Sequence, residues 1–94
     1  MDMPEIEACD AEECSYNLGQ QCHAWAITVG DLESPHCDTF IDADMSGGEE
    51  EFMARVGACK TSECMFNMHL ECSADQVTVG HKNGQVDCLT FATG

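Results

Sequence analysis

The sequence predicts a small, metal-stabilised fold that is mainly β or irregular and is built as two tandem units, each a two-thiol turn plus a short β-hairpin. Three observations favour this class. The chain has only 94 residues, its eight cysteines fall into two matching sets of four, and both halves contain a β-branched stretch that ends at glycine. Units of roughly 35 residues bury too little apolar surface to fold on it alone, so the cysteines are expected to hold each unit together.

The two cysteine sets have nearly identical spacings. The first follows C-x4-C-x7-C-x14-C and the second C-x4-C-x7-C-x15-C, and residues 8–30 align with residues 58–80 without a gap. Four thiolates are the ligand number of a closed tetrahedral site, and short fixed spacings are typical of such sites. We therefore expect two metal sites, whose ligands are Cys9, Cys14, Cys22 and Cys37 in the first set and Cys59, Cys64, Cys72 and Cys88 in the second.

The elements of each unit follow in a fixed order. C-x4-C leaves room for a tight turn or a short helical turn, and Asn17 and Asn67 suit a positive φ or an Asx-turn just after it. Ile-Thr-Val-Gly and Val-Thr-Val-Gly then predict a short strand that runs into a turn. In that strand Ile27 and Val29 share one face, whereas Thr28 points to the other, and the second copy repeats this pattern.

A variable loop precedes the last cysteine in each unit. It spans Asp31–His36 in one copy and His81–Asp87 in the other, as the tip of a hairpin tolerates. Thr39-Phe40 and Thr90-Phe91 then predict a returning strand. The matched aromatic residues are expected to pack over the site, with an exposed recognition patch as the alternative; they are Tyr16, Phe66, Phe40 and Phe91.

The repeat also suggests the domain organisation. We expect an N-terminal tail at 1–6, a first unit at 7–41, an acidic, glycine-containing linker at 42–56 and a second unit at 57–94. Within the linker, Ser46-Gly47-Gly48 is typical of a flexible break. Glu49–Arg55 fits two helical turns, because its acidic residues come first and Arg55 comes last, although a plain solvated linker fits nearly as well.

Residues that the second copy does not repeat are poor candidates for shared ligands. None of His23, His36, His69 and His81 has a histidine at the aligned position, so histidine is not expected to ligate in both units. His23 and His36 adjoin cysteines and are candidates for a supporting hydrogen bond, with plain solvent exposure as the alternative. Trp25 aligns with Asp75, so it is either a contact with the other unit or an anchor for a partner.

The choice between metal and disulfides depends on the compartment. The N-terminus is acidic and lacks the basic and apolar regions of a secretory signal, and no apolar run approaches a membrane span. We therefore expect a cytoplasmic protein with reduced thiols, which favours metal, while an extracellular disulfide-stapled domain remains the alternative. Four soft thiolates suit Zn²⁺, two per chain, ahead of iron, since the C-x2-C loops of common iron sites are absent.

The charge limits the classes of partner. The chain has eighteen acidic residues and only three basic ones, Arg55, Lys60 and Lys82, which gives a formal net charge of −15. Nucleic acids and anionic membranes need a basic face, so neither is expected as a partner. We interpret the acidity as a means of solubility, with an unknown, basic protein partner or a surface that weakly collects cations as the alternatives.

The site chemistry argues against an enzyme. A four-cysteine site has no open position for an activated water, and no catalytic motif is present. We expect a zinc-binding protein with two structural sites that acts as a small interaction module, with metallothionein-like zinc storage or a thiol redox sensor as alternatives.

The ordered motif resembles a known family. Both copies contain Ala-Cys-x4-Cys-x2-Asn-x4-Cys-x-Ala-x2-Ile/Val-x-Val-Gly, followed by Cys-x-Thr-Phe. This string is similar to a small bacterial four-cysteine family catalogued as a domain of unknown function, number fifteen-forty, here in a tandem pair. The resemblance implies a cytosolic metal-binding module without an established reaction, and it supplies no catalytic residues.

Overall fold

The strands of this protein are short, and both repeats contribute them, four from the first and five from the second in the part of the chain that the structure describes. The computed structural model describes residues 3–31, 34–43, 45–49 and 51–93, and within these ranges the chain has no helix, and so none that could span a membrane. The first repeat contributes β1 (Glu5–Cys9), β2 (Asn17–Leu18), β3 (Gln21–Cys22) and β4 (Ile27–Val29). The second contributes β5 (Val56–Cys59), β6 (Asn67–Met68), β7 (Glu71–Cys72), β8 (Gln76–Lys82) and β9 (Gln85–Cys88). The expectation of a mainly β and irregular chain is confirmed.

Each repeat forms a small hairpin between its second and third cysteines. β2 pairs with β3, and β6 pairs with β7, with the same register in the two copies. Asn17 accepts a hydrogen bond from the Gln20 amide, and Asn67 accepts one from the Leu70 amide, as an Asx-type turn requires. The expected Asx turn is confirmed, while the positive φ values belong to the residues after each asparagine, Gln20 and Leu70 among them.

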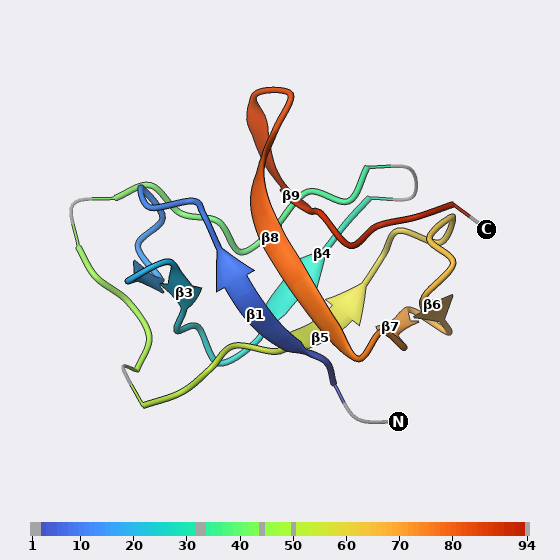
Figure 1. Ribbon diagram of the computed structural model, residues 1–94, viewed down its shortest axis with the longest axis horizontal. Helices are drawn as coiled ribbons and strands as arrows, with labels where there is room; N and C mark the ends of the chain where they lie inside the picture. Colours follow the sequence, from blue (N-terminus) through green and yellow to red (C-terminus); the bar gives the residue numbers. More distant parts are fainter. Residues whose placement is uncertain (1–2, 32–33, 44, 50, 94) are drawn as a thin grey trace.

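The parallel strand pairs join one repeat to the other. β1 runs parallel to β8, and β4 runs parallel to β5 (Figure 1). The first strand of each repeat therefore pairs with the fourth strand of the other repeat. The registers of the two pairs are equivalent, because Cys9 lies opposite Val79 and Cys59 lies opposite Val29. Both pairs also have a register shift at the equivalent place, N-terminal to these cysteines. The repeats are therefore related by an approximate internal two-fold symmetry.

The exchanged strands enclose one shared core. Its largest fully buried aliphatic side chains are supplied by both repeats at matching positions: Ile6 and Val56, Ile27 and Val77, and Val29 and Val79. The side chains of Ile27 and Val29 are buried while Thr28 is only partly so, which confirms the predicted alternation. The sequence favours two separate units, whereas in the structure the apolar face of each strand packs against the partner repeat. Burial of that face explains the pairing, because a unit as small as one repeat buries little apolar surface by itself.

Two glycines allow the repeats to approach closely. A Cβ on Gly30 would lie 2.6 Å from the Cβ of Lys60 and 2.9 Å from its backbone nitrogen. A Cβ on Gly80 would lie 2.7 Å from the carboxylate of Asp10, which occupies the position equivalent to Lys60. The repeated Gly therefore serves the contact between repeats, and at Gly30, where φ is 138°, it also allows a backbone conformation that other residues rarely adopt.

The hairpin expected before the last cysteine is present in the second repeat. β8 and β9 pair antiparallel from Val79 opposite Cys88 to Lys82 opposite Gln85, and the turn is Asn83-Gly84, both with positive φ. In the first repeat a single bridge joins Val29 to Cys37, and residues 32 and 33 of this loop lie outside the described residues. The strand expected after each last cysteine does not form, since β9 ends at Cys88 itself.

The segments on either side of the first repeat are more ordered than the sequence suggests. Glu5 and Ile6, placed in the N-terminal tail, belong to β1, because Ile6 fills the core opposite Val77. The break at Ser46–Gly48 is tied to the first repeat, where the Gly47 amide donates to the Ser15 carbonyl at 2.8 Å.

The helical turns predicted at Glu49–Arg55 are absent from the described part of that range, which excludes residue 50. The Ala54 amide donates to the Cys22 carbonyl and the Ala54 carbonyl accepts from the Ile6 amide. Ala54 is fully buried, so its backbone groups are used between repeats and are not free to close a helical turn.

Candidate metal centres

The four cysteines of the first repeat line one small apolar cavity. Cys9 ends β1, Cys22 ends β3, Cys14 lies in the turn between them, and Cys37 comes from the last segment of the repeat. The cavity has a volume of about 10 Å³, which leaves room for roughly one water-sized sphere. It is too small for an organic ligand, and four thiols surround it.

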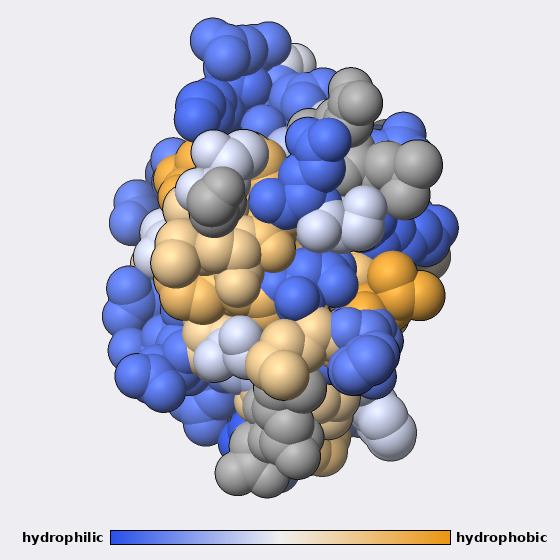
Figure 2. All heavy atoms as spheres, turned by 90° about the vertical axis from the view of Figure 1, so that its right-hand side faces the viewer, coloured by the Kyte–Doolittle hydropathy of each residue, from blue (hydrophilic) through white to orange (hydrophobic). Residues whose placement is uncertain are grey.

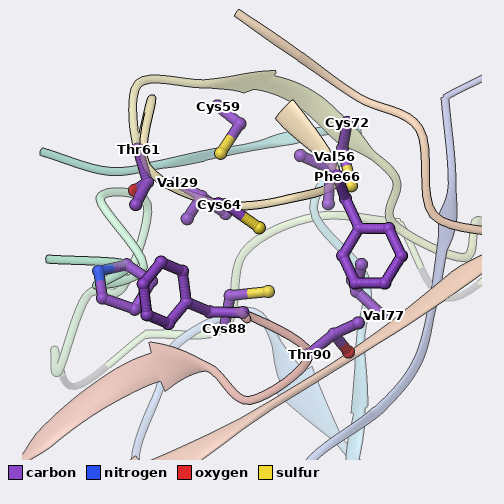
Figure 3. A pocket seen from close by; sticks show the side chains of 12 residues that line it. Val29, Val56, Cys59, Thr61, Cys64, Phe66, Cys72, Val77, Cys88 and Thr90 are labelled. Carbon is purple, nitrogen blue, oxygen red and sulfur yellow. The ribbon is translucent and has the colours of Figure 1, made fainter. Parts of the chain in front are cut away.

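The second repeat builds an equivalent cavity from Cys59, Cys64, Cys72 and Cys88. Its volume is also about 10 Å³, and it shares no cysteine with the first cavity. Figure 3 shows the four cysteines placed around it, with Phe66 and Thr90 beside them. The eight cysteines predicted as ligands therefore separate in space into the same two sets of four that the sequence defines.

Local hydrogen bonds explain how the two-thiol turn presents its cysteines. The Cys14 amide donates to the Ala11 carbonyl at 3.0 Å and so closes the turn. The Asn17 side chain donates to the Cys9 carbonyl at 2.8 Å. In the second repeat Asn67 donates to the Cys59 carbonyl at the same distance. The repeated asparagine thus fixes the end of the first strand relative to the hairpin that carries the third cysteine.

Each cavity is closed by side chains of the other repeat. Val79 and Val86 of the second repeat line the first cavity, and Val29 and Pro35 of the first repeat line the second. The last cysteines are held in the same reciprocal way: the Cys37 amide donates to the Val86 carbonyl, and the Cys88 amide donates to the Pro35 carbonyl, both at 2.7 Å. Sequence reasoning missed this contribution, because the repeated valines predict a buried face without saying which repeat covers it.

Burial disfavours the ionised form of five of the eight thiols. Desolvation raises the pKa of Cys22, Cys37 and Cys88 to about 11 in each case. The same cause raises the pKa of Cys9 and Cys72. Neighbouring cysteines of the same set add to these shifts, because thiolates that lie close together repel. Without a cation, the interior of each cavity therefore disfavours thiolates.

Backbone amides nevertheless point at the sulfur atoms in both repeats. The amide two residues after a cysteine acts to lower the thiol pKa in every shifted case, for example Ala11 for Cys9 and Thr39 for Cys37. Such a donor stabilises the ionised sulfur and not the neutral thiol. Ala24 and Ala74 supply this backbone amide for the third cysteines, Cys22 and Cys72. The cavities are therefore provided with donors for thiolates that burial alone opposes.

The donor set fits a soft divalent ion, although the thiols of each set have not closed around a single point. All eight cysteines are free, without a disulfide. Among the described residues, no three histidine, cysteine, aspartate or glutamate side chains already have the arrangement of a formed metal site. Four thiols around one atom-sized cavity, with amide donors aimed at the sulfurs, have the chemistry that Zn²⁺ requires.

The repeat that builds the two cavities also decides the family. The family model described as Domain of Unknown Function (DUF1540) matches residues 8–40 and again residues 58–91. This chain belongs to the DUF1540 family. The two matched segments cover all eight cysteines and confirm the tandem pair of units that the motif suggests. No curated protein and no solved structure matches the chain.

Three of the four histidines of this DUF1540 protein hydrogen-bond to groups other than the thiols. Nδ1 of His23 contacts the Phe52 carbonyl at 2.8 Å, and Nε2 of His36 contacts Asp38 at 3.1 Å. His81 lies between Asp10 and Glu13, at 2.9 and 2.7 Å. His23 and His36, the two histidines that adjoin cysteines, therefore make hydrogen bonds to groups other than the sulfur atoms.

The repeated aromatic residues lie beside the cavities. Tyr16 and Phe40 line the first cavity, and Phe66 and Phe91 line the second. Tyr16, Phe40 and Phe66 are partly buried and pack against the core. The expectation that these aromatics pack over the sites is confirmed for the three residues.

Proposed function

We propose that the chain binds two Zn²⁺ ions, one in each four-cysteine cavity, and that the metal stabilises a small interaction module. The observation that carries the proposal is the separation of eight cysteines into two equivalent cavities that share no thiol. The amide donors directed at the sulfurs support it, since they favour the ionised form that binds metal.

Zinc would relieve the electrostatic conflict in each cavity. A divalent ion favours thiolates, whereas burial raises the thiol pKa, so binding at neutral pH would release protons. Structural Zn²⁺ contributes about 10–16 kcal/mol in apparent binding free energy. That exceeds what the short strands of each repeat supply by themselves. A role without catalysis follows from the proposal, because four thiolates leave no open ligand position.

Two separate ions fit the arrangement better than a storage cluster. Metallothionein-like storage of more than two ions needs thiolates that bridge metals, and the two cavities have no cysteine in common. A redox sensor remains a second candidate, because Cys37 and Cys64 are only partly buried, one in each set. Oxidation of either thiolate would remove a ligand and release the ion.

Metal analysis of the full chain, purified under reducing conditions, tests the proposal. We expect two zinc ions per chain and protection of the eight thiols from alkylation until a chelator is added. Three or four ions per chain would indicate a bridged cluster, and iron in place of zinc would change the metal assignment. Absence of metal, with all thiols reactive in the folded protein, would overturn the proposal.

A further inference from the structure

The single tryptophan lies on the surface and is paired with a residue from the segment between the repeats. Trp25 is 71% exposed, and its ring is 5.4 Å from that of Phe52, with an angle of 49° between the planes. Phe52 is itself 49% exposed. The ring partner of Trp25 therefore belongs to the segment between the repeats. The side chain exposes a large aromatic surface.

A hollow of about 470 Å³ lies next to Trp25. Tyr16, Ala24, Ala26 and Thr39 of the first repeat line it together with Gly48 and Glu49. Among these described residues, Glu49 carries the only charge. The hollow is therefore lined with aromatic and small side chains and has a carboxylate at its edge. It differs from the two thiol cavities, which hold little more than one atom.

The second repeat shows that the fold does not require this surface. At the equivalent place, Ala74, Asp75 and Gln76 line a hollow that also contains Arg55 and Glu5. Arg55 and Glu5 form an ion pair at 3.0 Å there. An aspartate thus occupies the position of Trp25 in the second copy of the same structure, and the aromatic surface is an addition to the first copy alone.

The other exposed apolar area differs in kind. Figure 2 shows the face over β6 and β7, where apolar side chains gather with hydrophilic ones around them. Met65, Met68 and Leu70 are more than half exposed in this part of the second repeat. None of these three residues lines the hollow beside Trp25 or the one that contains Arg55. The surface around Trp25 combines an aromatic pair with a hollow, so it is the better-defined candidate for an interaction.

We propose that Trp25, Phe52 and the adjoining hollow bind a protein segment in which lysine or arginine neighbours a large apolar residue. Three features match that chemistry. The exposed indole face attracts a cation and buries apolar surface at the same time. Glu49 can pair with the same cation. The whole chain repels acidic segments and attracts basic ones, because it has 18 acidic residues and only three basic ones.

Two of the three basic residues of the chain are paired with carboxylates that do not line the hollow. Arg55 is paired with Glu5, and Lys60 is paired with Asp38 at 3.3 Å. The inference rests on the proposed role as an interaction module and extends it by naming the surface and the partner chemistry. It does not require either metal site to open, since the hollow includes none of the eight cysteines.

A synthetic peptide of alternating arginine and leucine serves as the probe, and the same peptide with glutamate for arginine serves as its control. Trp25 is the only tryptophan, so its fluorescence reports directly on the site. We expect binding of the arginine-leucine peptide to shift and change this emission, with no response to the glutamate peptide. Calorimetry then compares the variants in the metal-loaded full chain.

The variant Trp25→Asp copies the second repeat and makes the chain more negative. Binding that depends only on net charge should strengthen in this variant, whereas binding at the hollow should weaken by at least tenfold. Leu18→Asp is the matched control, because Leu18 is 54% exposed, lies outside the hollow and receives the same charge. We expect this control to bind the peptide about as well as the unaltered chain.

The outcomes separate the two proposals. Equal affinity of Trp25→Asp and Leu18→Asp would overturn the docking surface, as would equal binding of an arginine peptide without leucine. Zinc stoichiometry is measured on the same samples. Two ions per chain without selective peptide binding would leave the metal proposal standing and reject this surface.

Discussion

Replacing Cys64 by serine removes one ligand of the second site, and the exchanged strands predict that the first site is weakened as well. The second repeat supplies β8, which pairs with β1, and it supplies Val79 and Val86 to the wall of the first cavity. If loss of zinc unfolds the second repeat, these groups leave the first site. The first site would therefore weaken although it keeps all four of its own thiols.

The magnitude follows from the contacts at the first site. Hydrogen bonds from the Asp10 amide to the Val79 carbonyl and from the Cys37 amide to the Val86 carbonyl would be lost, at about 1 kcal/mol each. Both valines are buried, and exposing each costs about 1.5 kcal/mol or more. The total is about 5 kcal/mol, which corresponds to between three and four orders of magnitude in zinc affinity at the first site.

Competition with a chromophoric chelator measures this affinity, and nuclear magnetic resonance of bound cadmium-113 follows the two sites separately. Met65→Ser is the matched control, because Met65 adjoins Cys64, is 58% exposed and aligns with Ser15 of the first repeat. We expect two intact sites in Met65→Ser and severe weakening of both in Cys64→Ser. One zinc bound to Cys64→Ser with unaltered affinity would refute the reasoning and show that the repeats act independently.

Three further predictions concern the glycines, the thiols and a surface histidine. Gly30→Ala should lower the free energy of unfolding by about 2 kcal/mol or more, because φ of Gly30 is 138° and the added Cβ would meet the backbone of Lys60. Gly80→Ala should lower it by less, since only the carboxylate of Asp10 must move. Chemical denaturation of the metal-loaded chain measures both. Zinc binding at pH 7 should release protons and weaken as pH falls, because thiol pKa values reach about 11; calorimetry in buffers of different ionisation enthalpy counts the protons. Glu13→Gln should lower the pKa of His81, which the hydrogen bond that the imidazole donates to Glu13 raises; a nuclear magnetic resonance titration measures this pKa.

The sign of the histidine effect sets its pH range. The pKa of His81 is higher in the folded chain than in the unfolded one, where it is about 6.5. Its contribution to stability is therefore complete below that unfolded value and disappears as the pH rises through the folded-state pKa. An unchanged His81 pKa in Glu13→Gln would contradict this account. Equal free energies of unfolding for Gly30→Ala and Gly80→Ala would contradict the prediction for the glycines. Zinc binding without proton release would contradict the prediction for the thiols.

Much of the site was predictable because the repeat acts as an internal comparison. Positions that both copies keep, such as Asn17 and Asn67, hold the backbone around the cysteines in the same way. Positions that differ, such as Trp25 and Asp75, lie away from the two cavities. Identity between copies therefore separated the shared framework from local additions without any tertiary information.

The segment between the repeats was predicted less well. Glu49–Arg55 has helical charge order, yet the backbone of Ala54 is used for hydrogen bonds to Cys22 and Ile6. Local propensity favoured a helix, and tertiary hydrogen bonding overrode it, because each buried amide and carbonyl needs a partner.

The sequence by itself determined the unit: four cysteines at fixed spacing, a turn closed by asparagine and a valine strand that ends at glycine. Only the tertiary structure decided that Ile6 pairs with Val77 and that Val56 pairs with Ile27, so that each repeat completes the other. Two nearly equivalent copies have nearly equivalent strands, and a local pattern predicts that a face is buried without specifying its partner. Burial of both faces against one another is the arrangement that leaves neither repeat with an exposed apolar strand.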